Sequence, residues 1–159
     1  MSVTTTGAFT LEPFLNPGPG EPLGTLVGAG SSAGDGTGGS NAITWNLGDF
    51  VYVLRGLSAG HNSSTDKVLN LRFNTGYQVG GFDETLGKTA TATAITGLTT
   101  FIEWTPPSIF IQPRDATVEI SAQMGNVNLI TLVAAFRALV FPQNILQVAD
   151  PSILAQFIV

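Results

Sequence analysis

DFVYVLR at residues 49–55 and KVLNLRFN at residues 67–74 decide the fold class. The first run is apolar on both faces and rich in β-branched and aromatic residues, which indicates a strand buried on both sides. The second run alternates, with Leu69, Leu71 and Phe73 on one face and polar residues on the other. Both patterns predict β-strands, and neither has a helical period.

Further runs of the same kind follow, separated by turn signals such as Gly80-Gly81 and Pro106-Pro107. The run at 129–140, LITLVAAFRALV, is also compatible with a buried helix, but its β-branched residues and the lack of a polar face favour a central strand. Seven or eight short strands at regular spacing predict an all-β protein, either an antiparallel β-sandwich or a jelly-roll-like barrel. The other expected strands are residues 89–95, 100–105, 109–112 and 117–123.

Glycine and proline are concentrated near the N-terminus. Nine of the 22 residues from Gly18 to Gly39 are Gly, and no helical or alternating period survives there. We therefore expect residues 1–40 to form an extended arm and long loop, residues 41–142 the β core, and residues 143–159 a short apolar tail. Asp150-Pro151 in that tail fits the start of a short helix.

The composition excludes several classes of protein. The chain has 159 residues, which predicts one domain, and only 11% of them are charged against about 25% in typical globular proteins. The absence of Cys excludes disulfides, Cys-based zinc sites and thiol nucleophiles. The net charge of −5 has the wrong sign for binding nucleic acid or anionic lipid.

No targeting or spanning segment is expected. A secretory signal begins with basic residues, but the first basic residue here is Arg55. The mainly apolar run 129–136 is too short to cross about 30 Å of hydrocarbon. We expect synthesis in the cytoplasm and no membrane partner.

One segment matches a cofactor motif by spacing. Residues 28–33, GAGSSA, fit the dinucleotide-binding pattern G-x-G-x-x-A, with Asp49 about twenty residues further on. That pattern works only where its glycines open a helix, and the glycine-rich residues 34–39 that follow cannot be helical. A calcium turn through Asp35 would need a repeated motif, which is absent. A flexible loop without a cofactor or metal is the interpretation that we favour.

The catalytic candidates are few. His61 is the only histidine, so a triad or metal site would rest on it alone, and we interpret it as a turn residue. Asp83-Glu84, or Glu103 with Glu119, could form a glycosidase pair, but Glu103 and Glu119 also fit outward charges that prevent edge pairing of strands. We expect no catalytic residues and no enzymatic activity.

Four aromatic residues bear on a second possibility, a phage tail or fibre component or a lectin-like glycan-binding module. Trp104 shares a face with Ile102, and Tyr52 is also expected in the core. Trp45 and Tyr77 are less constrained. Exposure of Trp45 and Tyr77 would favour glycan binding, whereas burial of both would exclude it.

The two ends of the chain carry apolar residues with no evident core of their own. Such residues either pack on their own domain or contact a neighbouring subunit, because exposed apolar patches cause association. We predict the second alternative, with extended segments that add strands or clamps to a neighbour. The predicted interface residues are Phe9, Leu11, Phe14, Leu15, Ile153, Leu154, Phe157, Ile158 and Val159.

In length, low charge and organisation, the whole chain resembles the β-rich decoration or cement proteins of tailed-bacteriophage capsids. The resemblance implies a structural virion protein on the capsid exterior that binds between major capsid subunits and stabilises the shell without a catalytic step. It also implies a homo-oligomer, most often a trimer, with the major capsid protein as partner.

Overall fold

The computed structural model of this chain describes residues 3–34, 39–48, 50–79, 82–95, 99–105, 118–125 and 130–142, with side chains for all of these except 74–79, 82–86 and 118. This part of the chain contains β-strands and no helix, which confirms the predicted all-β class. The strands are β1 (Val3–Thr6), β2 (Ala8–Pro13), β3 (Gly24–Ala33), β4 (Asn41–Leu47), β5 (Val51–His61), β6 (Lys67–Val79), β7 (Phe82–Ala92), β8 (Thr100–Trp104), β9 (Val118–Met124) and β10 (Thr131–Phe141).

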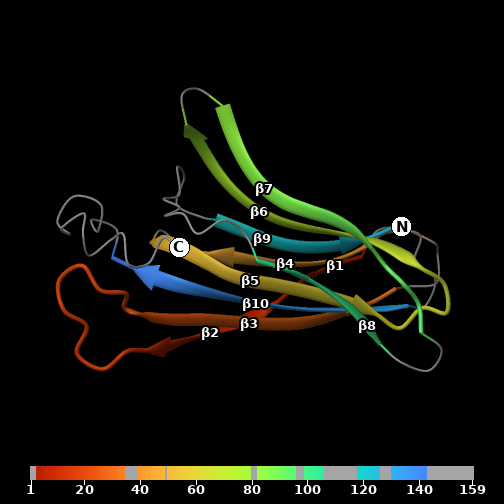
Figure 1. Cartoon of the computed structure of the whole chain (residues 1–159), viewed down its shortest axis with the longest axis horizontal. Coiled ribbons are helices and arrows are strands. Elements are labelled where there is room, and N and C mark those ends of the chain that lie inside the picture. The colour runs from red at the N-terminus through yellow and green to blue at the C-terminus, as the bar shows by residue number, and fades with distance from the viewer. Residues whose placement is uncertain are drawn as a thin grey trace.

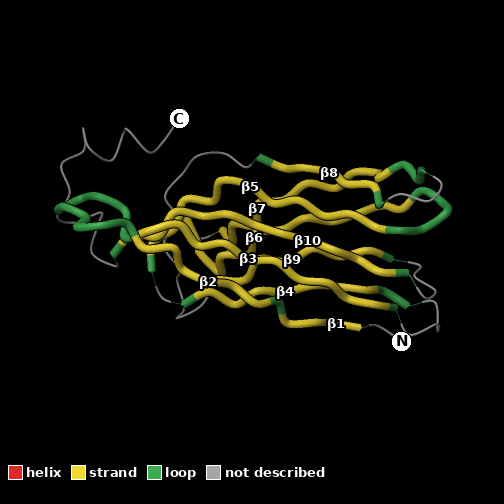
Figure 2. The backbone as a smooth tube through the Cα atoms, turned by 90° about the horizontal axis from the view of Figure 1, so that it is seen from below, coloured by secondary structure: helices red, strands yellow, loops and turns green. Residues whose placement is uncertain are grey.

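The strands form two sheets that pack face to face as a β-sandwich (Figure 1, Figure 2). Sheet A has the order β1-β4-β9-β6-β7, and sheet B has the order β2-β3-β10-β5-β8. Neighbouring strands run antiparallel except for β1 and β4, which are parallel. The architecture is therefore the predicted antiparallel sandwich with one parallel pair at the edge of sheet A.

The core lies between the sheets and follows the alternation of the strands. Leu69, Leu71 and Phe73 of β6 are fully buried, as their spacing predicts. Full burial of such a side chain contributes about 1.5–3 kcal/mol. Val51 to Leu54 of β5 are also buried on both faces of the strand, in agreement with the pattern of the run at 49–55. The largest fully buried side chains are Trp45, Tyr52, Phe73, Phe141, Ile43, Leu47, Leu54, Leu57, Leu69, Leu71, Ile120 and Met124.

The run at 129–140 forms a strand and not a helix. It is β10, in the middle of sheet B between β3 and β5. Its side chains alternate, so that Leu132, Ala134 and Phe136 point into the core. Two neighbouring strands satisfy its backbone, which explains why an apolar run without a polar face is stable there.

β5 shifts the phase of its inward-facing residues in mid-strand. Leu54 points into the core before the shift and Leu57 after it, a spacing of three residues where a regular strand has two. In the pairing with β10, Arg137 lies opposite Gly56 and Ala138 lies opposite Leu54. Arg55 is therefore the extra residue of a β-bulge, and neither Arg55 nor Gly56 belongs to the core.

The prediction that residues 1–40 form an arm and long loop is wrong at the strand positions. β3, in the middle of the glycine-rich segment, is an inner strand of sheet B. Its inward positions include Gly28, where an added Cβ would lie 2.1 Å from Cε1 of Phe136. The buried Phe136 ring thus fills the volume that a side chain at Gly28 would occupy, and it packs edge-on against Trp45 with 5.1 Å between ring centroids. A small residue on β3 thus packs against a large residue on its neighbour β10. For this reason the sequence of β3 does not show the alternation of large apolar and polar residues that is typical of a strand.

Gly7 lets the N-terminal segment cross from one sheet to the other. β1 before it belongs to sheet A and β2 after it belongs to sheet B. The backbone N–H of Gly7 donates to the carbonyl of Thr44 at 2.7 Å. An added Cβ at Gly7 would lie 2.1 Å from Nε1 of Trp45, and this Nε1 donates to the carbonyl of Ala8 at 3.2 Å. Residues 3–13 are therefore bound to the sandwich itself.

Some sequence predictions lie outside the described residues. They are the strand at 109–112, the apolar tail at 143–159 and the helix start at Asp150-Pro151. Among the residues that the structure describes, no helix has the length and hydropathy needed to cross a membrane.

Candidate functional site

β2 is the outermost strand of sheet B and carries two of the predicted interface residues. Phe9 lies opposite Gly28 and Leu11 opposite Leu26, so both point to the core side of the sheet. Because β2 is at the edge, the opposite sheet does not cover them fully: Phe9 is 41% exposed and Leu11 is 46% exposed. The backbone of the predicted arm thus packs on its own domain, while its apolar side chains stay open to a partner.

The turn after β2 carries the other two predicted interface residues of the N-terminal segment, Phe14 and Leu15. Phe14 is 44% exposed and Leu15 is 91% exposed. Hydrogen bonds close this loop: Phe14 N–H donates to the carbonyl of Leu23 at 2.9 Å, and the N–H of Gly18 donates to Oε2 of Glu21 at 2.9 Å. The loop therefore holds Leu15 away from the core. The five predicted C-terminal interface residues, Ile153, Leu154, Phe157, Ile158 and Val159, lie outside the described residues.

His61 is buried, and the prediction of a turn residue is wrong. It is the last residue of β5 and is 0% exposed. Its Nδ1 accepts a hydrogen bond from Ser63 N–H at 3.1 Å, so Nε2 carries the proton and donates to the carbonyl of Ala92 at 2.9 Å. Thr100 Oγ1 lies 3.4 Å from the same Nε2. Because β5 is in sheet B and Ala92 is in sheet A, His61 joins the two sheets, and both ring nitrogens are engaged.

A second buried polar group joins the sheets near the same end. Asn41 of β4 is 0% exposed, and its Oδ1 accepts a hydrogen bond from the hydroxyl of Ser32 in β3. Its Nδ2 donates to the carbonyls of Ser32 at 2.5 Å and Ile130 at 3.3 Å. Thr5 of β1 adds a hydrogen bond to Ser32 Oγ at 2.9 Å. Leu132 lies opposite both His61 and Ser32 in the register of sheet B, so one row of residues carries both polar contacts.

Glu103 and Glu119 do not form a pair suited to glycoside hydrolysis. Glu103 is exposed on β8 at the edge of sheet B, where an outward charge was expected. Glu119 is exposed on β9, in the middle of sheet A. The two thus belong to different sheets. The side chains of Asp83 and Glu84 lie outside the described set.

The aromatic residues follow the core prediction where they are described. Trp45 and Tyr52 are buried, and Trp104 packs against the core from the edge strand β8 with Ile102. Because Trp45 is buried, it cannot contact a glycan at the surface. The side chain of Tyr77 lies outside the described set.

Residues 28–33 do not form a dinucleotide-binding turn. They lie within β3 instead of opening a helix, and the strand continues through them. Residues 28–33 therefore provide no helix N-terminus for a pyrophosphate. Asp49 and Asp35 lie outside the described residues. Within the described part of the chain, no three His, Asp or Glu side chains cluster in a way that could hold a metal ion.

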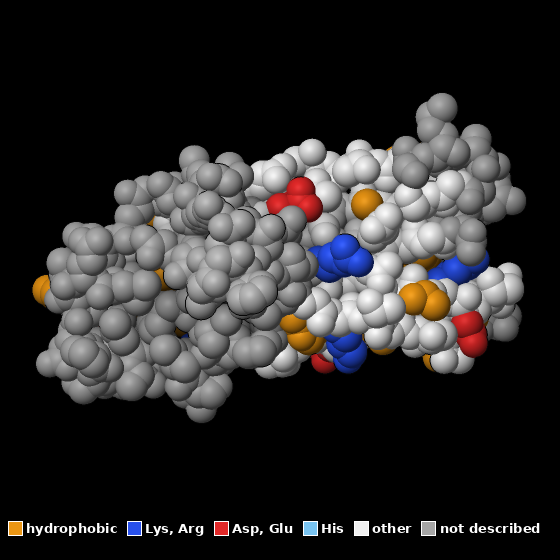
Figure 3. All heavy atoms as spheres, turned by 90° about the horizontal axis from the view of Figure 1, so that it is seen from above, with side chains coloured by type: hydrophobic (Ala, Val, Ile, Leu, Met, Phe, Trp, Pro, Cys, Tyr) orange, Lys and Arg blue, Asp and Glu red, His pale blue; other side chains and the backbone are white. Residues whose placement is uncertain are grey.

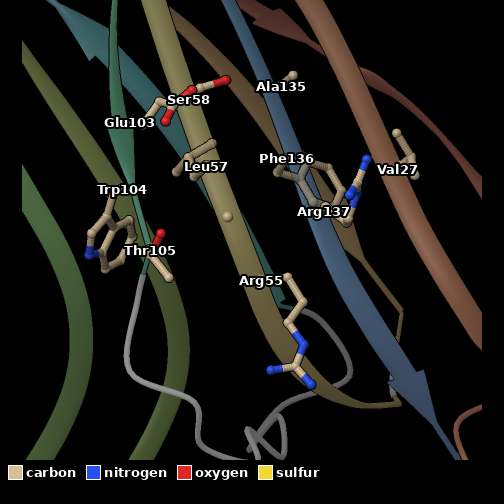
Figure 4. A pocket seen from close by; sticks show the side chains of 11 residues that line it. Val27, Arg55, Leu57, Ser58, Glu103, Trp104, Thr105, Ala135, Phe136 and Arg137 are labelled. Carbon is tan, nitrogen blue, oxygen red and sulfur yellow. The ribbon is translucent and has the colours of Figure 1, made fainter. Parts of the chain in front are cut away.

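A groove of about 390 Å³ lies on the outer face of sheet B, where the β5 bulge interrupts the strand (Figure 4). The hollow is present because Gly56 has no side chain and Ala135 on β10 has a short one. Arg55 and Arg137 project from the adjacent strands β5 and β10, and Ser58 lies beside Glu103 of β8. The lining residues are Val27, Arg55, Gly56, Leu57, Ser58, Glu103, Trp104, Thr105, Ala135, Phe136 and Arg137.

The groove could not be predicted from the sequence. Arg55 is the end of one strand run, and Arg137 is a single charge within an apolar run. The available signal was the spacing of three residues between Leu54 and Leu57, which marks a bulge next to Arg55. The pairing of Arg137 with Gly56 depends on long-range register and could not be read from local sequence.

By its structure, the chain is an all-β sandwich domain with an open apolar edge and a polar groove. No family model matches the chain, and no curated protein matches it. Among solved structures, the enzymatically active domain of bacteriophage CBA120 tailspike protein 4 aligns with 84% of this chain and 18% of its own length, at 11% identity and a TM-score of 0.37.

TmCBM61, solved in complex with β-1,4-galactotriose, aligns with 75% of this chain and 63% of its own length, at 9% identity and a TM-score of 0.29. A chain in the structure of the infectious bursal disease virus Gt strain aligns with 82% of this chain and 42% of its own length, at 12% identity and a TM-score of 0.32. This chain thus spans less than two thirds of the length of each. At TM-scores below 0.5, these matches assign neither a family nor a function.

Proposed function

We propose that this chain is a virion structural protein that decorates a phage capsid and stabilises it by binding between major capsid subunits. Its role is mechanical, without a catalytic step, nucleic acid or membrane. It acts on the capsid exterior as a homo-oligomer, a trimer in the simplest arrangement, after synthesis in the host cytoplasm.

The observation that carries this proposal is the apolar edge of sheet B. Edge strands of monomeric proteins are usually protected from pairing by lysines, inward charges or a cover. β2 carries only Glu12 and Pro13 in this role, and all its side chains are exposed. Together with Leu15 in the next turn, it offers main-chain groups and apolar side chains to a neighbouring subunit.

The low charge of the surface supports the same role. Only 11% of the residues are charged, and Figure 3 shows scattered single Lys, Arg, Asp and Glu side chains on the described part of the face that it presents. Such a surface fits a protein whose final state is packed against neighbours. Ordering an interface costs conformational entropy at each contact, so many copies on one shell would supply the avidity that a single contact lacks.

Binding to assembled shells tests the proposal. A neighbouring portal, protease or major capsid gene identifies the shell protein to use. Purified chain is mixed with shells of that protein, sedimented and quantified, and the melting temperature of the shells is measured with and without it. We expect saturable co-sedimentation and a higher melting temperature of the decorated shells. Absence of both effects overturns the proposal.

A further inference from the structure

We propose that the groove on the outer face of sheet B binds an acidic sugar, with Arg137 holding the carboxylate of the sugar. Ser58, Thr105 and Glu103 would then meet its hydroxyl groups. This inference does not rest on the proposed capsid role, because the groove and the β2 edge are separate surfaces.

The shape of the groove suits a small ligand. Its volume of about 390 Å³ falls within the roughly 300–1,000 Å³ typical of small-molecule sites. Gly56 forms part of the floor, and a Cβ added there would meet no atom nearer than the carbonyl oxygen of Trp104 at 3.9 Å. The floor is therefore open because a side chain is absent, and a ligand can approach the backbone of β5.

The described residues that line the groove differ in charge from the chain as a whole. The chain has six basic and eleven acidic residues, whereas the described lining residues include two arginines and one carboxylate. Arg137 is exposed and makes no hydrogen bond or ion pair with other described residues. A guanidinium presents N–H donors in a planar fork that matches a carboxylate.

The remaining lining groups favour a sugar acid over inorganic phosphate. Glu103 adds a negative charge beside Ser58, which repels a dianion but accepts hydrogen bonds from sugar hydroxyls. The hydroxyls of Ser58 and Thr105 can both donate and accept. A ligand with one carboxylate and several hydroxyl groups therefore uses each kind of group in the groove.

NMR titration of the full chain tests this inference. The probes are D-glucuronate and D-galacturonate, the methyl ester of each, and inorganic phosphate, all up to about 20 mM to cover the millimolar Kd expected of a shallow site. We expect shifts of the amide signals of Arg55–Ser58 and Ala135–Arg137 with at least one sugar acid, and binding at least about tenfold weaker with its ester.

Variants locate the site. Arg137→Ala should weaken binding of the sugar acid about tenfold or more. Arg137→Lys should bind more weakly than wild type and more tightly than Arg137→Ala, because the charge remains but the planar fork of N–H donors is lost. Gly56→Trp should abolish binding by filling the floor. Arg72→Ala is the matched control, because Arg72 is exposed on β6 of sheet A and its loss removes the same charge.

Each variant is first shown by thermal unfolding to be folded, and if Gly56→Trp does not fold, the Arg137 variants alone decide. The inference is overturned if neither sugar acid binds, if ester or phosphate binds as tightly, or if Arg137→Ala binds like Arg72→Ala.

Discussion

Gly28 lies directly against the ring of Phe136, and an added Cβ atom would be 2.1 Å from Cε1 of that ring. The contact joins β3 to β10, because Gly28 and Phe136 are direct partners in the register of sheet B. The same ring packs on Trp45 of sheet A. One missing side chain thus makes room for an aromatic pair that spans the sandwich.

We predict that Gly28→Ala destabilises the protein by about 1–3 kcal/mol, because the Phe136 ring must move within a packed core. Urea unfolding followed by tryptophan fluorescence measures the effect. Gly125→Ala is the control, since no atom lies within 4 Å of its added Cβ, and it should be neutral or slightly stabilising. Equal midpoints for the two variants would show that the ring contact does not constrain β3.

His61→Ala should reduce the free energy of unfolding by about 3 kcal/mol or more. The substitution leaves the Ser63 N–H and the Ala92 carbonyl without their buried partner, at about 1–3 kcal/mol each. Ser64→Ala, at an exposed neighbouring position, should change stability by no more than about 0.5 kcal/mol. If both variants unfold at the same denaturant concentration, His61 is not a structural link between the sheets.

Asn41→Asp should destabilise the protein in a pH-dependent way. The new carboxyl group would be buried against the carbonyls of Ser32 and Ile130, which raises its pKa in the folded state. Relative to wild type, the stability loss should therefore be smallest below about pH 3.9 and should grow as the pH rises above it. Asn41→Ala, which adds no titratable group, should show a loss independent of pH. Calorimetry of the three proteins from acid to neutral pH checks this, and parallel curves for both variants would refute it.

Replacing Phe14 and Leu15 by Ser should abolish self-association without loss of stability, because both side chains are exposed in the isolated chain. Light scattering gives the molar mass, and thermal unfolding gives the stability. Val68→Ser removes a similarly exposed apolar side chain from sheet A and should leave the molar mass unchanged. A double variant with the mass of wild type would place the contact elsewhere.

The strands with strict alternation could be predicted from the sequence because local spacing fixes which side chains face the core. β6 is the example. β10 is instead predicted from its β-branched residues and its lack of a polar face. β3 could not be predicted in this way. Its inward positions include Gly28, which is buried only because the rings of Phe136 and Trp45, distant in the chain, pack there.

The candidate sites also differ in how far local sequence could predict them. Phe9, Leu11, Phe14 and Leu15 are exposed, and their role in an interface stays a prediction. The environment of His61 depends on Ala92 and Thr100 from other strands, so the sequence could not distinguish a turn residue from a buried link. The arginine groove required the register of β5 against β10 as well.

The positions of β9 and β10 have a consequence for how the chain reaches this fold. β9 joins the β1–β4 pair to the β6–β7 pair in sheet A, and β10 joins the β2–β3 pair to the β5–β8 pair in sheet B. Until residues 118–141 leave the ribosome, the described strands can form only separate two-stranded units, which are marginally stable in water. Both sheets are therefore completed only when residues 118–141 have been made, and their apolar faces depend on this segment for cover.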